Sequence, residues 1–268
     1  MNEMIYGMPF SEYQARPELN HSSLKNLFPP NTPLDYAWHK NNPKAKTSAM
    51  EFGTALHTAV FEHDKFAENV IVMPDFDRRT KVGKEAHAEF MLSSAGKTAI
   101  SAEEMIACQY ILKTAQSHAI LGKLLRAENR KYEVSGFFNF EGVPCKFRTD
   151  FMLPDQHIIL DLKTTKRGHE RAFKNSVLDF SYHSQAAFYL SAMAEITGES
   201  WADFIWIAIE SVAPYKIYLY EPDTRWLIEG HKLCTDAIHL YKECLETGIY
   251  PSVAEEITIL NAPNWIGE

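Results

Sequence analysis

The sequence predicts an α/β fold in which helices flank a central mixed sheet. Two observations carry this prediction. Between residues 133 and 163 the chain holds three short segments rich in β-branched and aromatic residues, and apolar residues recur at helical spacing before and after them. An order of helix, three strands, helix and further strands favours helices packed around a mixed sheet.

Length and composition favour one globular domain over residues 1–268. A chain of 268 residues with 46% hydrophobic residues can bury a large core. No apolar run approaches the roughly 20 residues of a membrane-spanning helix, and the opening residues lack the basic-then-apolar order of a signal peptide. We therefore expect a cytoplasmic protein without a membrane partner.

Charge and cysteine usage exclude some classes of protein. A formal charge of -8 argues against general nucleic-acid coating, so any DNA contact must be local. One candidate is the basic run at residues 78–84. The four cysteines show no CxxC spacing, which indicates reduced, mostly buried thiols and not a zinc knot or a disulfide framework; they are Cys108, Cys145, Cys234 and Cys244.

In the first half of the chain the pattern is helical. Residues 29–33 are proline-rich and separate an opening helical turn, begun by Ser22 or Ser23, from a second short helix. Residues 50–61 have the spacing of an amphipathic helix with one buried stripe. Residues 64–85 are expected to be irregular, and polar helices are expected at residues 84–94 and 102–126.

The second half begins with the strands. Segments 133–140, 145–152 and 158–163, separated by Gly142 and by residues 153–156, predict a three-stranded meander. A helix is expected at residues 179–196, a buried strand at 204–210, a partner strand at 216–220 and a long closing helix at 225–245.

The turn at residues 153–156 brings charged residues together. If the flanking strands pair antiparallel about a centre between Asp155 and Gln156, Asp150 lies opposite Asp161. Opposed β-carbons are about 5 Å apart, so the two carboxylates repel each other unless a cation lies between them. Because side chains alternate along a strand, Lys163 shares the face of Asp161 and Leu162 points into the core.

Two carboxylates and an ammonium on one face suit phosphodiester hydrolysis. Magnesium binds carboxylates, carbonyl oxygens and phosphate oxygens, and the lysine can orient or help deprotonate a bound water. On the Asp-x-Lys spacing alone, ordinary turn acids with a surface ion pair are the better interpretation. The position of Asp161 directly after the apolar residues 158–160 favours a functional role, because an unpaired buried charge is costly.

Four ordered motifs extend this argument: Gly53-Thr54-Ala55-Leu56-His57 with Glu62; Cys145-Lys146-Phe147-Arg148-Thr149-Asp150; Asp161-Leu162-Lys163-Thr164-Thr165; and Gln185 with Tyr189. Together they resemble the RecB-type branch of the PD-(D/E)xK nucleases. The chain resembles most closely the RecE (exonuclease VIII) type of nuclease domain. Residues 20–24, residues 76–80 and the pair Gly83-Lys84 add to the resemblance, which covers nearly the whole chain.

The resemblance implies a role for each motif residue. It implies that His57, Asp150, Asp161 and the Leu162 carbonyl bind the metal, that Lys163 acts on the water, and that Gln185 and Tyr189 position Lys163 and the DNA phosphate. Without it, His57 would be interpreted as a satisfied core histidine, and Tyr189 as a packing residue. Glu62 either supports a ligand or ends the helix. Arg78, Arg79 and Lys84 are a separate hypothesis for gripping DNA phosphates.

The resemblance also implies an activity. We expect a magnesium-dependent exodeoxyribonuclease, with Mn²⁺ able to substitute, that degrades linear double-stranded DNA from the 5′ end. The 3′ overhang would serve a RecT-like single-strand annealing protein in recombination. The enzyme is expected to be a ring-shaped homo-oligomer of phage or prophage origin.

Three alternatives stay open. A RecB-like nuclease with an iron–sulfur cluster would require clustered cysteines, and those of this chain are scattered. A DNA-binding module of the same fold without catalysis would have no reason to keep Asp150, Asp161 and Lys163 together. An endonuclease, or a nuclease of the other polarity, would differ in the DNA ends that it needs.

Overall fold

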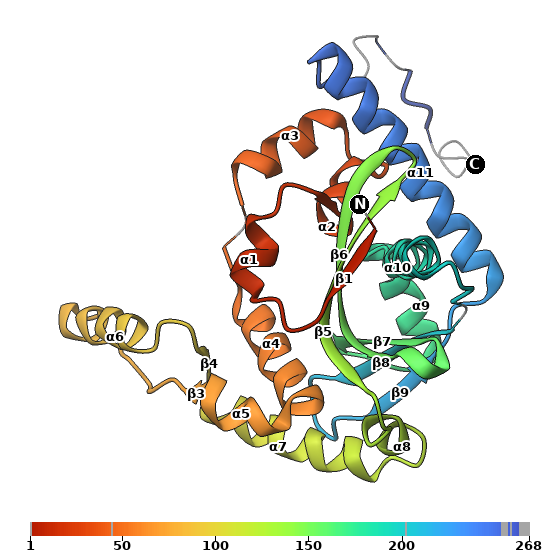
Figure 1. Cartoon of the computed structure of the whole chain (residues 1–268). Coiled ribbons are helices and arrows are strands. Elements are labelled where there is room, and N and C mark those ends of the chain that lie inside the picture. The colour runs from red at the N-terminus through yellow and green to blue at the C-terminus, as the bar shows by residue number, and fades with distance from the viewer. Residues whose placement is uncertain (1, 44, 202, 253–256, 258, 263–268) are drawn as a thin grey trace.

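A computed structural model of the chain describes residues 2–43, 45–201, 203–252, 257 and 259–262. A mixed sheet of seven strands forms its centre, in the order β1-β5-β6-β7-β8-β9 with β2 paired to β6 (Figure 1). The strands are β1 Glu3–Ile5, β2 Leu19–Asn20, β5 Lys131–Phe140, β6 Val143–Leu153, β7 Ile158–Thr165, β8 Asp203–Glu210 and β9 Ile217–Tyr220. Strands β5, β6 and β7 form the antiparallel meander that the sequence predicted, and β7 and β8 run parallel.

Helices cover both faces of the sheet, which confirms the predicted fold class. On one face, α9, α10 and α11 pack over a core that contains Phe188 and Trp206. On the other, α4 and α7 pack over a core that contains Leu56 and Leu162. The longer helices are α3 Pro33–Asn41, α4 Ser48–Phe61, α6 Lys81–Ser93, α7 Ala102–Ser117, α9 Glu170–Asp179, α10 Tyr182–Thr197 and α11 Thr224–Thr247; the shorter ones are α1 Phe10–Ala15, α2 His21–Leu24, α5 His63–Asn69 and α8 Leu121–Leu125.

Several predicted boundaries were wrong. Residues 64–85 are not irregular throughout, because α5 and strand β3 (Val70–Val72) fill residues 63–72, and β3 pairs with β4 (Thr98–Ile100). The predicted helix at 102–126 is two helices, since the chain turns extended at His118. Asp179 ends α9 and does not begin α10, because Ser181 adopts a left-handed conformation between the two helices. Asn20 caps α2, so that helix begins at His21 and not at Ser22 or Ser23.

The regular pleat breaks where β5, β6 and β7 meet. In the ladder of β5 with β6, Glu133 would face Asp150, but that pair is missing, and Glu133 has a φ of +49°. On either side of the break, Val134 belongs to one core and Tyr132 packs against the other, although alternation would put them on the same face. A left-handed residue inside a strand costs about 1–3 kcal/mol, and such strain collects at functional sites.

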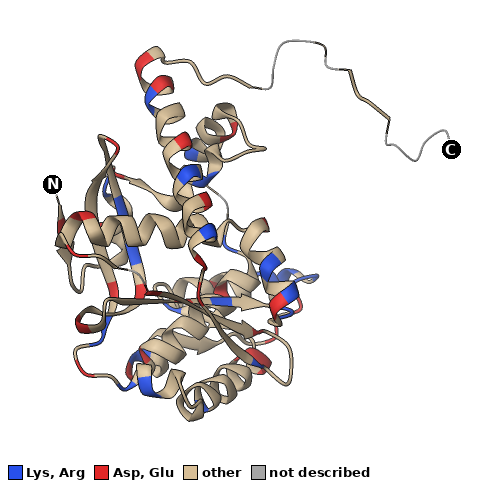
Figure 2. Cartoon of the chain, turned by 90° about the vertical axis from the view of Figure 1, so that its right-hand side faces the viewer, with Lys and Arg blue, Asp and Glu red and all other residues tan. Residues whose placement is uncertain are grey.

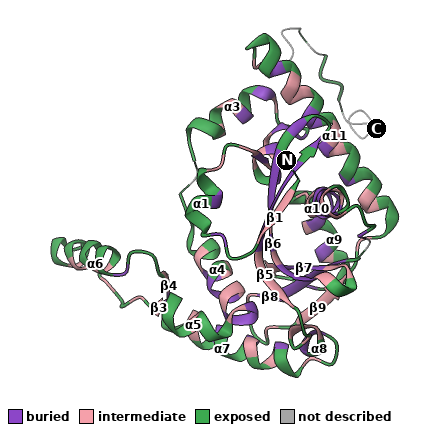
Figure 3. Cartoon of the chain, viewed as in Figure 1, coloured by how far each residue is buried: buried purple, intermediate pink, exposed green. Residues whose placement is uncertain are grey.

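A second region stands apart from these layers. Residues 73–97, here called the distal arm, join β3 to β4 and carry α6, which lies at the far left of Figure 1. No residue of α6 is buried, and Val82 and Leu92 are 75% and 79% exposed. Figure 3 shows the contrast between this exposed helix and the buried sheet. In the part of the chain that the structure describes, no helix has the length and apolar character to cross a membrane.

Candidate active site

Asp161 and Lys163 lie side by side on β7, as the alternation of side chains predicts. The Lys163 Nζ atom is 2.7 Å from Asp161 Oδ2. Gln185 of α10 joins the two: its Oε1 accepts a hydrogen bond from Lys163 Nζ at 2.8 Å, and its Nε2 donates to Asp161 Oδ1 at 3.0 Å. Leu162, between them, points into the opposite core. The amide of Gln185 therefore fixes the side chains of Asp161 and Lys163 relative to each other.

Burial makes the charges of Asp161 and Lys163 costly unless other groups stabilise them. Asp161 is 2% exposed, and its Oδ2 accepts no hydrogen bond of good geometry although Lys163 is close. Burial alone would lower the pKa of Lys163, but the negative charges of Asp161 and Asp150 outweigh it and raise that pKa. The ring of Tyr182 lies 4.5 Å from Lys163 Nζ and adds a cation–π contact. Lys163 is therefore held as an ammonium.

Asp150 approaches this group from β6. The observed register pairs Phe151 with Leu160, Met152 with Ile159 and Leu153 with Ile158, which confirms the predicted turn centre. The next pair would be Asp150 with Asp161. Instead the strands separate, and the Asp150 carboxylate accepts the Leu162 backbone N–H at 3.0 Å. A side-chain oxygen thus takes the place of a strand carbonyl at the point where β6 leaves β7.

His57 of α4 faces the same point. Its Nδ1 lies 3.3 Å from Asp150 Oδ2, and its Nε2 lies 3.1 Å from the Leu162 carbonyl oxygen. Burial lowers the pKa of His57, so the ring is neutral and carries a single N–H. One of its two nitrogens must then present a lone pair to an oxygen. A proton on Asp150, whose pKa is raised, or a cation bound between the ring and the carboxyl group can satisfy a lone pair on Nδ1.

The carboxyl group of Asp150 also requires a proton or a nearby cation to be stable in this position. Burial, followed by the charge of Asp161, raises its pKa well above the ordinary value. Among the described residues, no three acidic, histidine or cysteine side chains are gathered tightly enough to hold a metal ion. The His57, Asp150 and Leu162 oxygen and nitrogen donors nevertheless fit a divalent cation, with Asp161 turned toward Lys163. The four cysteines are free and buried and form no alternative centre.

Glu133 is a residue that sequence reasoning missed. It occupies the strand position beside Asp150, and its carboxylate pairs with the Arg148 guanidinium at 2.5 Å. Arg148 in turn donates to the Met8 carbonyl oxygen at 3.0 Å and to Ser135 Oγ at 2.7 Å. A glutamate with positive φ has no sequence signal, since asparagine, aspartate and glycine are the usual residues there. Only the neighbouring motif residues Arg148 and Asp150 could have drawn attention to its strand.

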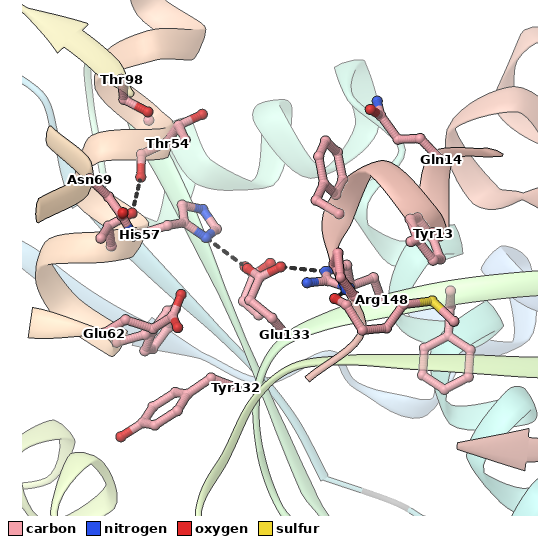
Figure 4. A pocket seen from close by; sticks show the side chains of 18 of the residues that line it. Tyr13, Gln14, Thr54, His57, Glu62, Asn69, Thr98, Tyr132, Glu133 and Arg148 are labelled. Carbon is pink, nitrogen blue, oxygen red and sulfur yellow. Dashed lines mark hydrogen bonds and ion pairs between the residues drawn. The ribbon is translucent and has the colours of Figure 1, made fainter. Parts of the chain in front are cut away.

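One open cavity of about 1270 Å³ is bordered by His57, Glu133, Arg148, Asp150 and Lys163. Figure 4 shows His57 and Glu62 from the α4 side, with Glu133 and Arg148 facing them from the sheet. Tyr189 lines the cavity and packs on Phe147 at 5.2 Å between ring centroids. Glu62 follows the last residue of α4 and pairs with Lys65. The cavity exceeds the roughly 300–1,000 Å³ of small-molecule sites.

The basic residues proposed for DNA lie elsewhere. Arg78 and Arg79 are in the loop before α6 and Lys84 is in its first turn, all exposed and none of them lining the cavity. Arg79 pairs with Asp77 at 2.8 Å. Figure 2 shows basic and acidic residues interspersed over the helices. The structure therefore brings seven of the ten predicted site residues together and leaves these three on the distal arm.

Comparisons with known proteins bear on the fold and the family. The fold matches the crystal structure of a candidate exonuclease from Eubacterium rectale with a TM-score of 0.63, over 96% of each chain and at 14% sequence identity. At that identity the match shows a shared fold. No curated protein matches the sequence. Residues 21–263 match the family model of the PDDEXK-like domain of unknown function DUF3799, and the chain therefore belongs to that PDDEXK-like family.

Proposed function

We propose that the chain is a metal-dependent nuclease that removes nucleotides from the ends of double-stranded DNA, in the manner of the RecE-type exonucleases. The observation that carries the proposal is the group of Asp161, Lys163 and Gln185 beside the His57–Asp150 pair, at the wall of a cavity large enough for a nucleic-acid strand. The family and the fold of the Eubacterium rectale protein support it.

In this proposal Mg²⁺ would be held by His57, Asp150, Asp161 and the Leu162 carbonyl, and Mn²⁺ would substitute. The bound cation would supply positive charge to the scissile phosphate and the leaving oxygen. Lys163 orients the attacking water through its ammonium, which Gln185 aims and the Tyr182 ring backs. A bound cation would offset the charges of Asp150 and Asp161, which raise the pKa of Lys163. The effect of burial, which lowers that pKa, would then dominate and allow Lys163 to exchange a proton.

The finer features of the function are also proposals. Degradation from the 5′ end, a 3′ overhang passed to a RecT-like annealing protein, and a ring-shaped homo-oligomer around linear DNA follow from the RecE resemblance. Arg78, Arg79 and Lys84 would grip the phosphates of the duplex from the distal arm, where the loop and α6 leave them exposed to solvent. Phosphate contacts by exposed cations are the sequence-independent part of DNA affinity.

A digestion with labelled ends tests the proposal. A linear duplex labelled at each 5′ end or at each 3′ end is incubated with the protein, with and without Mg²⁺, beside a closed circle. We expect early release of the 5′ label, loss of activity without the metal, and an intact circle. Asp161→Ala controls for a contaminating nuclease and should release nothing. A nicked circle would indicate an endonuclease, and bound but intact DNA would indicate an inactive binding module.

A further inference from the structure

Residues of the N-terminal segment, here residues 7–14, form the wall of the cavity opposite α4, where Figure 4 shows Tyr13 and Gln14. Two cations of β6, buried Lys146 and half-buried Arg148, hold this segment on the sheet. Lys146 donates to the carbonyl oxygens of Tyr13 and Arg16, at 2.7 and 2.5 Å, and Arg148 donates to that of Met8. The hydrophobic cluster beneath the segment is small and consists of Met8, Tyr13 and Phe137, with Ile5 at its edge. Hydrogen bonds from charged side chains therefore hold the segment in place, because the apolar core beneath it is small.

Aromatic rings on this segment form a column. Phe10 stacks on Tyr13 with ring centroids 6.3 Å apart and planes inclined by 21°, and Tyr13 packs on Phe137 at 6.5 Å. The Arg148 guanidinium lies 5.8 Å from the centroids of both Phe10 and Tyr13. Tyr13 and Phe137 are buried, whereas Phe10 is 52% exposed and lines the cavity. The outer ring of the column is thus available to a ligand.

Arg148 adds a free donor to the exposed ring. Its Nε and Nη1 are engaged by Glu133, Met8 and Ser135, but Nη2 has no hydrogen-bond partner within the described ranges. Arg148 lies two residues before Asp150 on β6, and both border the cavity. An aromatic face with an arginine beside it is the arrangement by which proteins bind single-stranded nucleic acid without sequence preference.

We propose that Phe10, backed by Tyr13 and flanked by Arg148, forms a stacking site for the unpaired terminal base of the DNA strand that is cut. The proposal rests on the proposed nuclease function and adds that the enzyme acts on a locally melted end. Stacking tolerates every base, as an enzyme that removes nucleotides in succession requires. In this arrangement the Nη2 donors of Arg148 would bind the phosphate that joins this nucleotide to the next.

Fluorescence of 2-aminopurine tests the site separately from cleavage. The probe is a duplex with 2-aminopurine at the 5′ terminus or well inside the same strand, bound to the Lys163→Ala protein without added Mg²⁺ so that cleavage is negligible during the measurement. We expect quenching of the terminal probe and not of the internal one. Adding Phe10→Ala should abolish the quenching and raise the dissociation constant for a single-stranded oligonucleotide about 5- to 100-fold.

Two variants sharpen the readout. Phe10→Tyr keeps an aromatic face and should restore both quenching and affinity. Trp38→Ala removes an aromatic residue that is 64% exposed on α3, outside the cavity lining, and should change neither. Unchanged quenching in the Phe10→Ala protein, or an equal effect of Trp38→Ala, would overturn the proposal. If the parent protein cuts no DNA yet quenches the probe through Phe10, the nuclease function fails and the stacking site stands.

Discussion

Two regions of this protein hold charged side chains in contrasting environments. Around β7, the charges of Asp161 and Lys163 are buried and joined by Gln185, with 3% and 14% of the two side chains exposed. On the distal arm, Arg78 and Lys84 are exposed on a helix and loop that bury almost nothing. Burying ions costs several kcal/mol each unless they are paired, so a buried charged group needs a reason, whereas an exposed one does not. Buried, paired charges are therefore stronger evidence for a functional site than exposed charges are.

The largest effect should come from the buried region. We expect Lys163→Ala to slow nucleotide release by about 10²–10⁴-fold, because in the proposed mechanism Lys163 orients the attacking water and exchanges a proton with it. Lys163→Arg retains the positive charge beside Asp161 and should preserve folding but not activity. Rates of acid-soluble nucleotide release, with thermal unfolding as the control for folding, measure both. A Lys163→Arg protein as fast as the parent would show that only charge matters there.

Gln185→Ala should have the next largest effect. The amide holds Lys163 and Asp161 through two hydrogen bonds, and removing a group that orients active-site residues typically costs about 10–100-fold in activity. We expect a lower kcat with little change in KM, because Gln185 acts through Lys163. Ser191→Ala is the matched control, since Ser191 lies on the same helix but contacts His231. Equal losses from both substitutions would make the effect one of helix packing.

The sequence predicted the centre of this buried region well. The three-stranded meander and its register followed from β-branched segments around a turn of defined length, and the register alone placed Asp150 beside β7. The pleat break at Glu133 could not be predicted, because glutamate is not a residue type that signals a positive φ in the sequence. Helix α5 and strand β3 were missed because they are short and because His63–Asn69 buries no residue. Exposed elements lack the hydrophobic periodicity on which such predictions depend.

Asp150→Asn should show that the buried region trades stability for function. Burial and Asp161 raise the pKa of Asp150, so without metal its stabilising protonated form is lost as the pH rises through that raised pKa. Asparagine stays neutral and still accepts the Leu162 N–H. We expect the metal-free variant to melt above the parent at pH 8 and to differ less at pH 4. Calorimetric titration with Mg²⁺ should show weaker binding by the variant; unchanged affinity would contradict its role as a ligand.

The distal arm should give the smallest effect, and one of a different kind. Replacing Arg78 and Lys84 with alanine removes two exposed cations, so stability should change by no more than about 0.5 kcal/mol. If both contact phosphates, the slope of log affinity against log salt should fall by about 2, equally for all DNA sequences. Lys113→Ala with Lys232→Ala removes the same charge from exposed positions on α7 and α11. The two double variants lose the same net charge, so their salt slopes should differ only if residues of the arm contact DNA. Identical salt slopes would show that the arm does not contact DNA.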